Sequence, residues 1–194
     1  MIVPLSVGVV GREVAVLSPA EKNLIYKELN DTYKLRTDFL LYTAVRIAEG
    51  YYLSEHPDCY RKSNNAIFLP QVKGLGKDRC TLKRRTVLLS EKGVAAVDAF
   101  YEKKIQFPTY QSMEPVFKRA ASDAGFDKRY ITTKALRKTM ISWLMACYPE
   151  REISIAMSSG HTPQTMYGYY MQQGWRKEDI RDMREEVKGW GDAP

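Results

Sequence analysis

Helix start and stop signals recur along almost the whole chain, and one internal stretch has the pattern of paired strands. Ser18 before Pro19, with Glu21 three positions after Ser18, is typical of a helix N-terminus with a capping box. Residues 66–70 and 85–89 are short β-prone runs joined by a connection rich in Lys, Arg and Gly, which predicts a hairpin with a basic tip. Helices are predicted over residues 19–30, 37–53, 90–104, 112–124, 134–147, 152–158, 164–172 and 178–188. We therefore expect a mainly α fold with a small antiparallel β-sheet, an α+β class.

No internal repeat, low-complexity tract or linker interrupts residues 18–190, which predicts one compact unit. Residues 1–17 are predicted to be an extended lead-in or linker remnant, 18–175 the domain itself, and 176–194 a C-terminal amphipathic helix and tail. The apolar N-terminal stretch lacks a basic segment and is too short to span a bilayer, so we predict neither a targeting signal nor a membrane segment.

The charge balance favours a polyanionic partner. The chain has 30 Lys and Arg against 23 Asp and Glu, a net charge of +7 and a pI near 9.2. Such a balance favours nucleic acid first and an acidic membrane surface second.

The three cysteines, Cys59, Cys80 and Cys147, are widely spaced and form no C-x-x-C pair. This indicates a reducing, intracellular compartment rather than a disulfide framework or a zinc site.

The chain lacks the ligand sets of the common hydrolytic and nucleotide-dependent enzymes. It has two histidines, no clustered carboxylates, no G-x-x-x-x-G-K-[ST] and no H-E-x-x-H. We therefore predict no metal and no cofactor. Basic residues in motif-like settings, followed by tyrosines, fit phosphoryl transfer without metal or nucleotide.

Two basic settings lie in the first half of the chain. Arg46 occurs in the stretch TAVRIAE, inside the helix predicted over 37–53, where its fork of donors would bind either Glu49 or a phosphate. The hairpin tip carries Lys73, Lys77 and, on the return strand, Lys83. A mobile lysine there could donate a proton to a leaving alkoxide, or it could contact DNA phosphates only.

Three further settings follow in order. They are KALR with Lys134 and Arg137, SGHTP with His161, and YGYY ending at Tyr170. His161 follows Arg137 by 24 positions, and Tyr170 follows His161 by 9. Each setting is a weak signal alone, but their order and spacing together are specific.

This succession resembles the catalytic domain of the tyrosine recombinases, a family that includes phage integrases and the Xer recombinases. The family's order is an arginine in a T-G-L-R-x-x-E box, a hairpin lysine, an H-x-x-R box, a G-H box and a tyrosine nine residues on. The resemblance runs from residue 18 to about 175 and implies the tyrosine recombinase catalytic-domain fold. The catalytic residues that it implies are Arg46, Lys73, Lys134, Arg137, His161 and Tyr170.

The resemblance also implies a reaction. The tyrosine phenol attacks a DNA phosphorus and displaces the 5′-oxygen, and the 3′-phosphotyrosyl link conserves the bond for rejoining, without metal or ATP. The two arginines and His161 would stabilise the developing charge, and the hairpin lysine would protonate the leaving oxygen. The implied partners are double-stranded DNA and other copies of the chain, as a dimer on one site and a tetramer on paired sites, in the cytoplasm of the host cell.

Two positions depart from the family pattern. Lys134 stands where most members have histidine, and this K-x-x-R form resembles integrases of archaeal viruses and plasmids, whose role is integration of mobile or viral genomes. Tyr169 adjoins Tyr170, so the nucleophile is assigned by spacing. The alternatives are a type IB topoisomerase-like enzyme and an inactive DNA-binding protein derived from a recombinase. Family members usually carry an N-terminal DNA-binding domain, and we see none in this sequence.

The predicted C-terminal helix has one apolar stripe, formed by Ile180, Met183 and Val187. Its own domain or a neighbouring copy on DNA could bury this stripe, and Gly174 would supply a hinge for exchange between copies.

Overall fold

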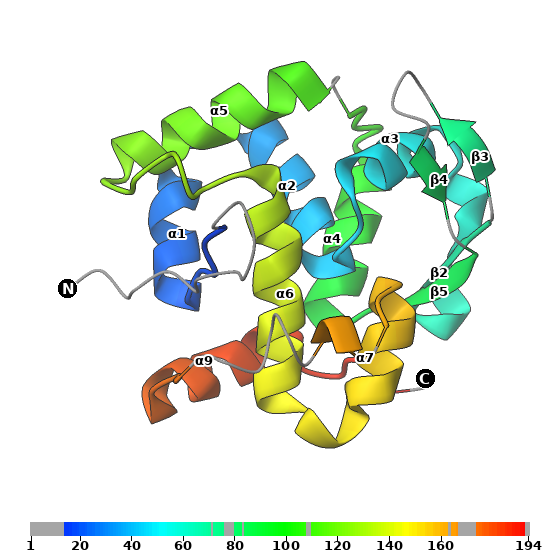
Figure 1. Cartoon of the computed structure of the whole chain (residues 1–194). Helices are drawn as coiled ribbons and strands as arrows, with labels where there is room; N and C mark the ends of the chain where they lie inside the picture. The colour runs from blue at the N-terminus through cyan, green and yellow to red at the C-terminus, as the bar shows by residue number, and fades with distance from the viewer. Residues whose placement is uncertain are drawn as a thin grey trace.

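The computed structural model describes residues 14–70, 72–75, 80–82, 84–107, 110–162, 164–166 and 174–192, with the backbone alone at 72–75, 80–82 and 110–111. The described part is mostly helical, with two small antiparallel sheets at one side (Figure 1). The longer helices are α1 (Pro19–Lys27), α2 (Asp31–Thr43), α3 (Ile47–Glu55), α4 (Glu91–Glu102), α5 (Tyr110–Asp123), α6 (Thr133–Cys147), α7 (Glu152–Ser159) and α9 (Lys177–Val187). The short 3₁₀ turns are η1 (Pro57–Cys59), η2 (Lys62–Asn64) and η3 (Pro149–Arg151).

The predicted capping box forms at the start of α1. The Ser18 hydroxyl accepts a hydrogen bond from the Glu21 backbone N–H at 3.3 Å, and the Glu21 carboxylate accepts one from the Ser18 N–H at 2.8 Å. The helix ends earlier than predicted, because Asn30 caps a second helix and accepts a hydrogen bond from Tyr33 N–H at 3.0 Å. The start predicted at residue 37 is therefore wrong, and α2 begins at Asp31.

The single buried helix predicted over residues 37–53 is also wrong. The chain leaves the helix after Thr43, because Ala44 adopts a left-handed conformation with φ of 49°. A new helix begins after Arg46, whose backbone N–H donates to the Glu49 carboxylate at 2.7 Å. That side-chain acceptor replaces the carbonyl that a continuous helix would have supplied. Arg46 therefore lies at a helix start and not inside a helix.

The two strands predicted for the hairpin are confirmed. β2 (Ala66–Leu69) pairs with β5 (Arg85–Leu88), Leu69 opposite Arg85, and β1 (Tyr60–Arg61) completes a three-stranded antiparallel sheet. Between β2 and β5, β3 (Val72–Leu75) and β4 (Cys80–Leu82) pair as a separate two-stranded sheet. Of the predicted basic tip and its return strand, residues 76–79 and Lys83 lie outside the described residues.

Helix α6 lies at the centre of the fold (Figure 1) and contacts α2, α5, α7 and α9. On this helix, which the sequence predicted over residues 134–147, Leu136, Met140 and Trp143 are fully buried. Burial extends nearly all round the helix and includes polar residues such as Thr139, whose hydroxyl accepts from the Leu17 N–H at 3.0 Å. α6 thus provides a rigid support for any side chain on it.

The C-terminal helix α9 packs on its own domain. Met183 and Val187 are fully buried against elements that include α6, and Glu186 forms a buried ion pair with Lys22 of α1 at 2.9 Å. Trp190, after the helix, is 2% exposed. The sequence left two ways to bury the apolar stripe, and in this structure its own domain buries Met183 and Val187.

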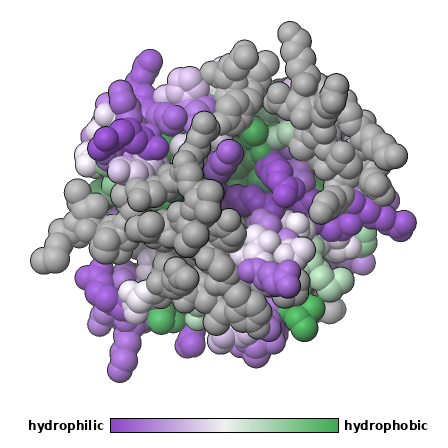
Figure 2. Space-filling view, viewed as in Figure 1, coloured by the Kyte–Doolittle hydropathy of each residue, from purple (hydrophilic) through white to green (hydrophobic). Residues whose placement is uncertain are grey.

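On the face drawn in Figure 2, hydrophilic residues form most of the described surface, and the apolar ones form small separate patches. Within the described residues, no helix combines the length and the apolar composition needed to cross a membrane.

Candidate active site

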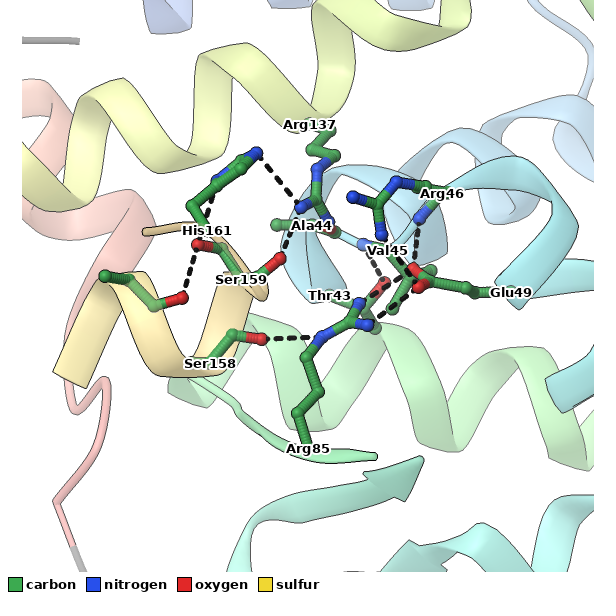
Figure 3. A network of polar contacts seen from close by, with 11 residues as sticks. Thr43, Ala44, Val45, Arg46, Glu49, Arg85, Arg137, Ser158, Ser159 and His161 are labelled. Atoms are coloured by element: carbon green, nitrogen blue, oxygen red, sulfur yellow. Dashed lines mark hydrogen bonds and ion pairs between the residues drawn. The ribbon is translucent and has the colours of Figure 1, made fainter. Parts of the chain in front are cut away.

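Three of the six predicted site residues meet in one place. Arg46 from the start of α3, Arg137 from α6 and His161 from the turn after α7 converge there (Figure 3). Lys134 is exposed in the first turn of α6, three positions before Arg137 and so on the same side of the helix. The backbone of Lys73 lies in β3. Tyr170 lies outside the described residues, as do the alternatives Tyr169, Lys77 and Lys83.

Arg137 is a buried guanidinium that joins the break after α2 to the C-terminal end of α7. Its Nη1 donates to the Ala44 carbonyl, and its Nη2 donates to the Ser159 carbonyl (Figure 3). The left-handed turn at Ala44 presents the first acceptor, and the C-terminal end of α7 presents the second. Planar guanidinium groups suit such fixed, multiple contacts. The break between α2 and α3, which the sequence did not predict, is therefore part of the site.

His161 follows Gly160, whose φ of 69° ends α7 in a left-handed turn. One ring nitrogen, Nδ1, lies 3.1 Å from the Ser159 hydroxyl, which itself donates to the Ala156 carbonyl at 3.2 Å. The other, Nε2, faces Arg137 Nη2 at 3.4 Å. Arg137 can only donate, so Nε2 must accept. The Ser159 hydroxyl already donates to the Ala156 carbonyl, so it accepts from the ring, and we assign the neutral tautomer with the proton on Nδ1.

The pKa of His161 lies well below its ordinary value. Burial, and then the positive charges of Arg137, Arg46 and Arg85, lower this pKa to about 4. His161 is therefore neutral at neutral pH. A phosphate placed among these cations would raise the pKa, because a negative charge favours the protonated ring.

Among the described residues, Glu49 is the one carboxylate in this cluster, and it is fully buried. The Nη1 group of Arg46 lies 3.1 Å from Glu49 Oε1, while 43% of the Arg46 side chain stays exposed. Burial alone would raise the pKa of Glu49, but the hydrogen bonds and charge of Arg85, with the Arg46 N–H, lower it to about 2. Glu49 is thus ionised at neutral pH.

The charges in the cluster do not cancel. Arg46, Arg85 and Arg137 contribute three positive charges against the one negative charge of Glu49, while His161 is neutral. In a partly buried place such an excess attracts anions more strongly than it would in open water. Within the described ranges, no group of three or more His, Cys, Asp and Glu residues could hold a metal ion.

Comparison with known proteins identifies the fold. No protein-family model and no curated protein matches the chain. Among solved structures, the XerA recombinase is 21% identical with a TM-score of 0.60, covering 92% of this chain and 66% of that one. The Tn1549 transposon integrase in complex with transposon right-end DNA is 15% identical with a TM-score of 0.62, covering 89% and 65%. The chain has the fold of a tyrosine recombinase catalytic domain.

A further structure with this tyrosine recombinase fold is the XerH site-specific recombinase bound to palindromic difH substrate in a post-cleavage complex. It is 14% identical with a TM-score of 0.58, covering 88% of this chain and 52% of that one. The chain spans slightly less than two thirds of the first solved chains that it matches. The prediction of fold class and catalytic-domain fold is confirmed.

Sequence reasoning missed one residue of this cluster in the tyrosine recombinase fold. Arg85 begins the strand predicted over residues 85–89 and was not among the predicted site residues, yet its side chain is 5% exposed and binds both oxygens of Glu49 at 2.7 Å (Figure 3). The available signal was Glu49 itself, an acid in an apolar stretch that needs a cationic partner when buried. That signal does not say which of the many arginines is the partner.

Proposed function

We propose that the chain is the catalytic part of a site-specific DNA recombinase that cleaves and rejoins DNA through a covalent 3′-phosphotyrosyl link, without metal or ATP. The observation that carries this proposal is the convergence of Arg46, Arg137 and His161, three residues far apart in sequence, in one cluster with excess positive charge. We assign residues 18–175 to the catalytic domain and 176–194 to its C-terminal helix and tail.

The proposed reaction uses the cluster as a cradle for the scissile phosphate. Arg46 and Arg137 donate hydrogen bonds to the non-bridging oxygens, whose negative charge grows in the transition state. His161 assists by taking up a proton as the phosphate binds, after which Nε2 can also donate. Each such donor contributes on the order of 10²–10³-fold to the rate in comparable anion-stabilising sites.

The proposal gives the remaining roles to Tyr170, Lys73 and Lys134. Tyr170 is the nucleophile, and Lys73 protonates the departing 5′-oxygen. Lys134 lies one turn from Arg137 and adds a donor or a positive charge at the edge of the cradle. The partners are double-stranded DNA and further copies of the chain, as a dimer on one site and a tetramer on paired sites, in the host cytoplasm. The K-x-x-R form supports an origin in a viral or plasmid integrase.

The test is covalent trapping. The purified protein is incubated in EDTA with a pool of nicked, end-labelled DNA duplexes. The arms of these duplexes are randomised, so that no single target sequence is assumed. The readout is the amount of protein–DNA complex that resists SDS. The proposal predicts a complex with the wild type and with Tyr169→Phe, and none with Tyr170→Phe. DNA binding without any covalent complex would instead favour an inactive relative. Relaxation of supercoiled DNA without strand exchange between duplexes would favour a topoisomerase-like enzyme.

A further inference from the structure

Two guanidinium groups join the same two segments of the site. One segment is the helix break, residues 44–49, and the other is the α7 end, residues 158–161. Arg137 joins the Ala44 carbonyl to the Ser159 carbonyl. Arg85 joins the Glu49 carboxylate to the Ser158 carbonyl, to which its Nε donates at 3.0 Å. Arg46 lies within the helix break, and His161 is the last residue of the α7 end.

We propose that Arg85 is a positioning residue of the candidate active site: it fixes Arg46 and His161 relative to each other and does not contact DNA itself. This inference rests on the proposed function for its catalytic consequence. Its structural part concerns the free protein and stands independently of any reaction.

The contacts of Arg85 explain why it would not bind a phosphate directly. Its side chain is 5% exposed, and its Nε, Nη1 and Nη2 each donate to an acceptor within the protein. By contrast, 43% of the Arg46 side chain is exposed, and Arg46 Nη1 contacts the same carboxylate at 3.1 Å. Glu49 therefore separates an inner guanidinium from an outer one, and the outer one is placed to meet a ligand.

Arg85 controls the position of Arg46 through Glu49. The carboxylate accepts from the Arg46 backbone N–H and from its guanidinium, so its orientation sets where α3 begins and where the Arg46 side chain points. The Arg85 fork binds both carboxylate oxygens and so fixes that orientation. A lysine would keep the charge but offers one ammonium group, which cannot match both oxygens in the same plane.

Arg85 also supports the turn that carries His161. Its Nε holds the Ser158 carbonyl in the last turn of α7, and a Cβ placed on Gly160 would lie 3.1 Å from Arg85 Cδ. The left-handed turn is thus packed directly against the Arg85 side chain. Loss of this contact would free the turn and the imidazole that follows it.

The experiment compares Arg85→Lys with Arg84→Lys, the adjacent exposed arginine, as the matched control. The rate of covalent complex formation is measured at saturating DNA, and the dissociation constant for DNA is measured in a separate experiment. Both measurements are made well below the melting temperature of each variant. Positioning predicts that Arg85→Lys slows the covalent step at least about tenfold, toward the roughly 10²-fold that a misplacement of about 1 Å costs. Its dissociation constant should stay within about twofold, and Arg84→Lys should leave the rate unchanged.

A second measurement uses the free protein and needs no cleavage. The chain has two histidines, so the imidazole NMR signals of His161 and His56 can be assigned readily. Arg85→Lys should shift or broaden the His161 signal and leave His56 unchanged. An unaltered His161 signal would overturn the inference, as would an unaltered cleavage rate or weaker DNA binding with a normal rate. If the wild type forms no covalent complex, the proposed function fails, and the His161 signal alone still decides the positioning role.

Discussion

Glu49→Gln removes the carboxylate between two guanidinium groups and changes the side-chain volume very little. Glu49 is fully buried and Arg85 is 5% exposed, so the variant leaves a buried guanidinium without its counter-charge. Removing one partner of a buried ion pair destabilises a protein by about 3–5 kcal/mol. The lowered pKa of Glu49 gives a similar figure: a fall from 4.5 to about 2 corresponds to about 3 kcal/mol, since one pKa unit is about 1.4 kcal/mol.

The assay is equilibrium unfolding in urea, with thermal unfolding as a second measure. A loss of about 3 kcal/mol in a chain of this size lowers the melting temperature by roughly 6–12 °C. Asp127→Asn is the matched control, because Asp127 also binds an arginine fork, Arg129, but both side chains are exposed to solvent. Its effect on the unfolding midpoint should be far smaller. If Glu49→Gln and the control gave equal, small changes, Glu49 would not hold the cluster together.

The pH dependence gives an independent check of the same reasoning. The folded pKa of Glu49 is lowered, so its contribution to the free energy of unfolding is complete above about pH 4.5 and is lost as the pH falls toward about 2. The stability difference between wild type and Glu49→Gln should therefore narrow over this range. A difference that stayed constant from pH 6 to pH 3 would contradict the low pKa.

Three further outcomes are expected. In the free protein, NMR titration should give His161 a pKa of about 4, below the ordinary histidine pKa of 6.5. The folded state should therefore lose stability as the pH falls from 6.5 toward 4, and a His161 pKa near 6.5 would refute the burial of its ring among cations. Gly160→Ala should destabilise the fold by about 1–2 kcal/mol in urea, since φ is 69° and the added methyl group meets Arg85; an unchanged midpoint would contradict the described turn. Truncation after Gly174 removes the buried residues of α9 together with Trp190 and should abolish cooperative unfolding by circular dichroism, whereas a stable truncated protein would mean that α9 is not part of the core.

Local signals made parts of this fold predictable. The capping box at Ser18 depends on four consecutive residues, so sequence alone specified it. Strands β2 and β5 were likewise predictable from two short β-prone runs and the connection between them, which is rich in Lys, Arg and Gly. The start of α2 was missed, although Asn30 is a good N-cap residue, because the polar residues after it give no apolar periodicity.

The break at Ala44 had no local signal. The stretch from Thr43 to Arg46 contains neither Gly nor Pro, and a left-handed alanine is unfavourable on its own. Tertiary partners stabilise it, above all Arg137, which lies 93 positions away and binds the Ala44 carbonyl. The pairing of Arg85 with Glu49 across 36 positions was hidden for the same reason. The meeting of Arg46, Arg137 and His161 could be predicted only because the order of the motifs resembles a known family.

The central claim is that the cationic cluster serves a tyrosine nucleophile on DNA. The most direct measurement is mass spectrometry of the protein trapped on nicked duplex in EDTA, digested with nuclease and protease, to find the peptide that carries the nucleotide. The proposed function predicts one adduct, on Tyr170. An adduct on Tyr169 would move the nucleophile by one residue, and an adduct on a residue outside residues 167–170, or none under conditions of saturated DNA binding, would contradict it.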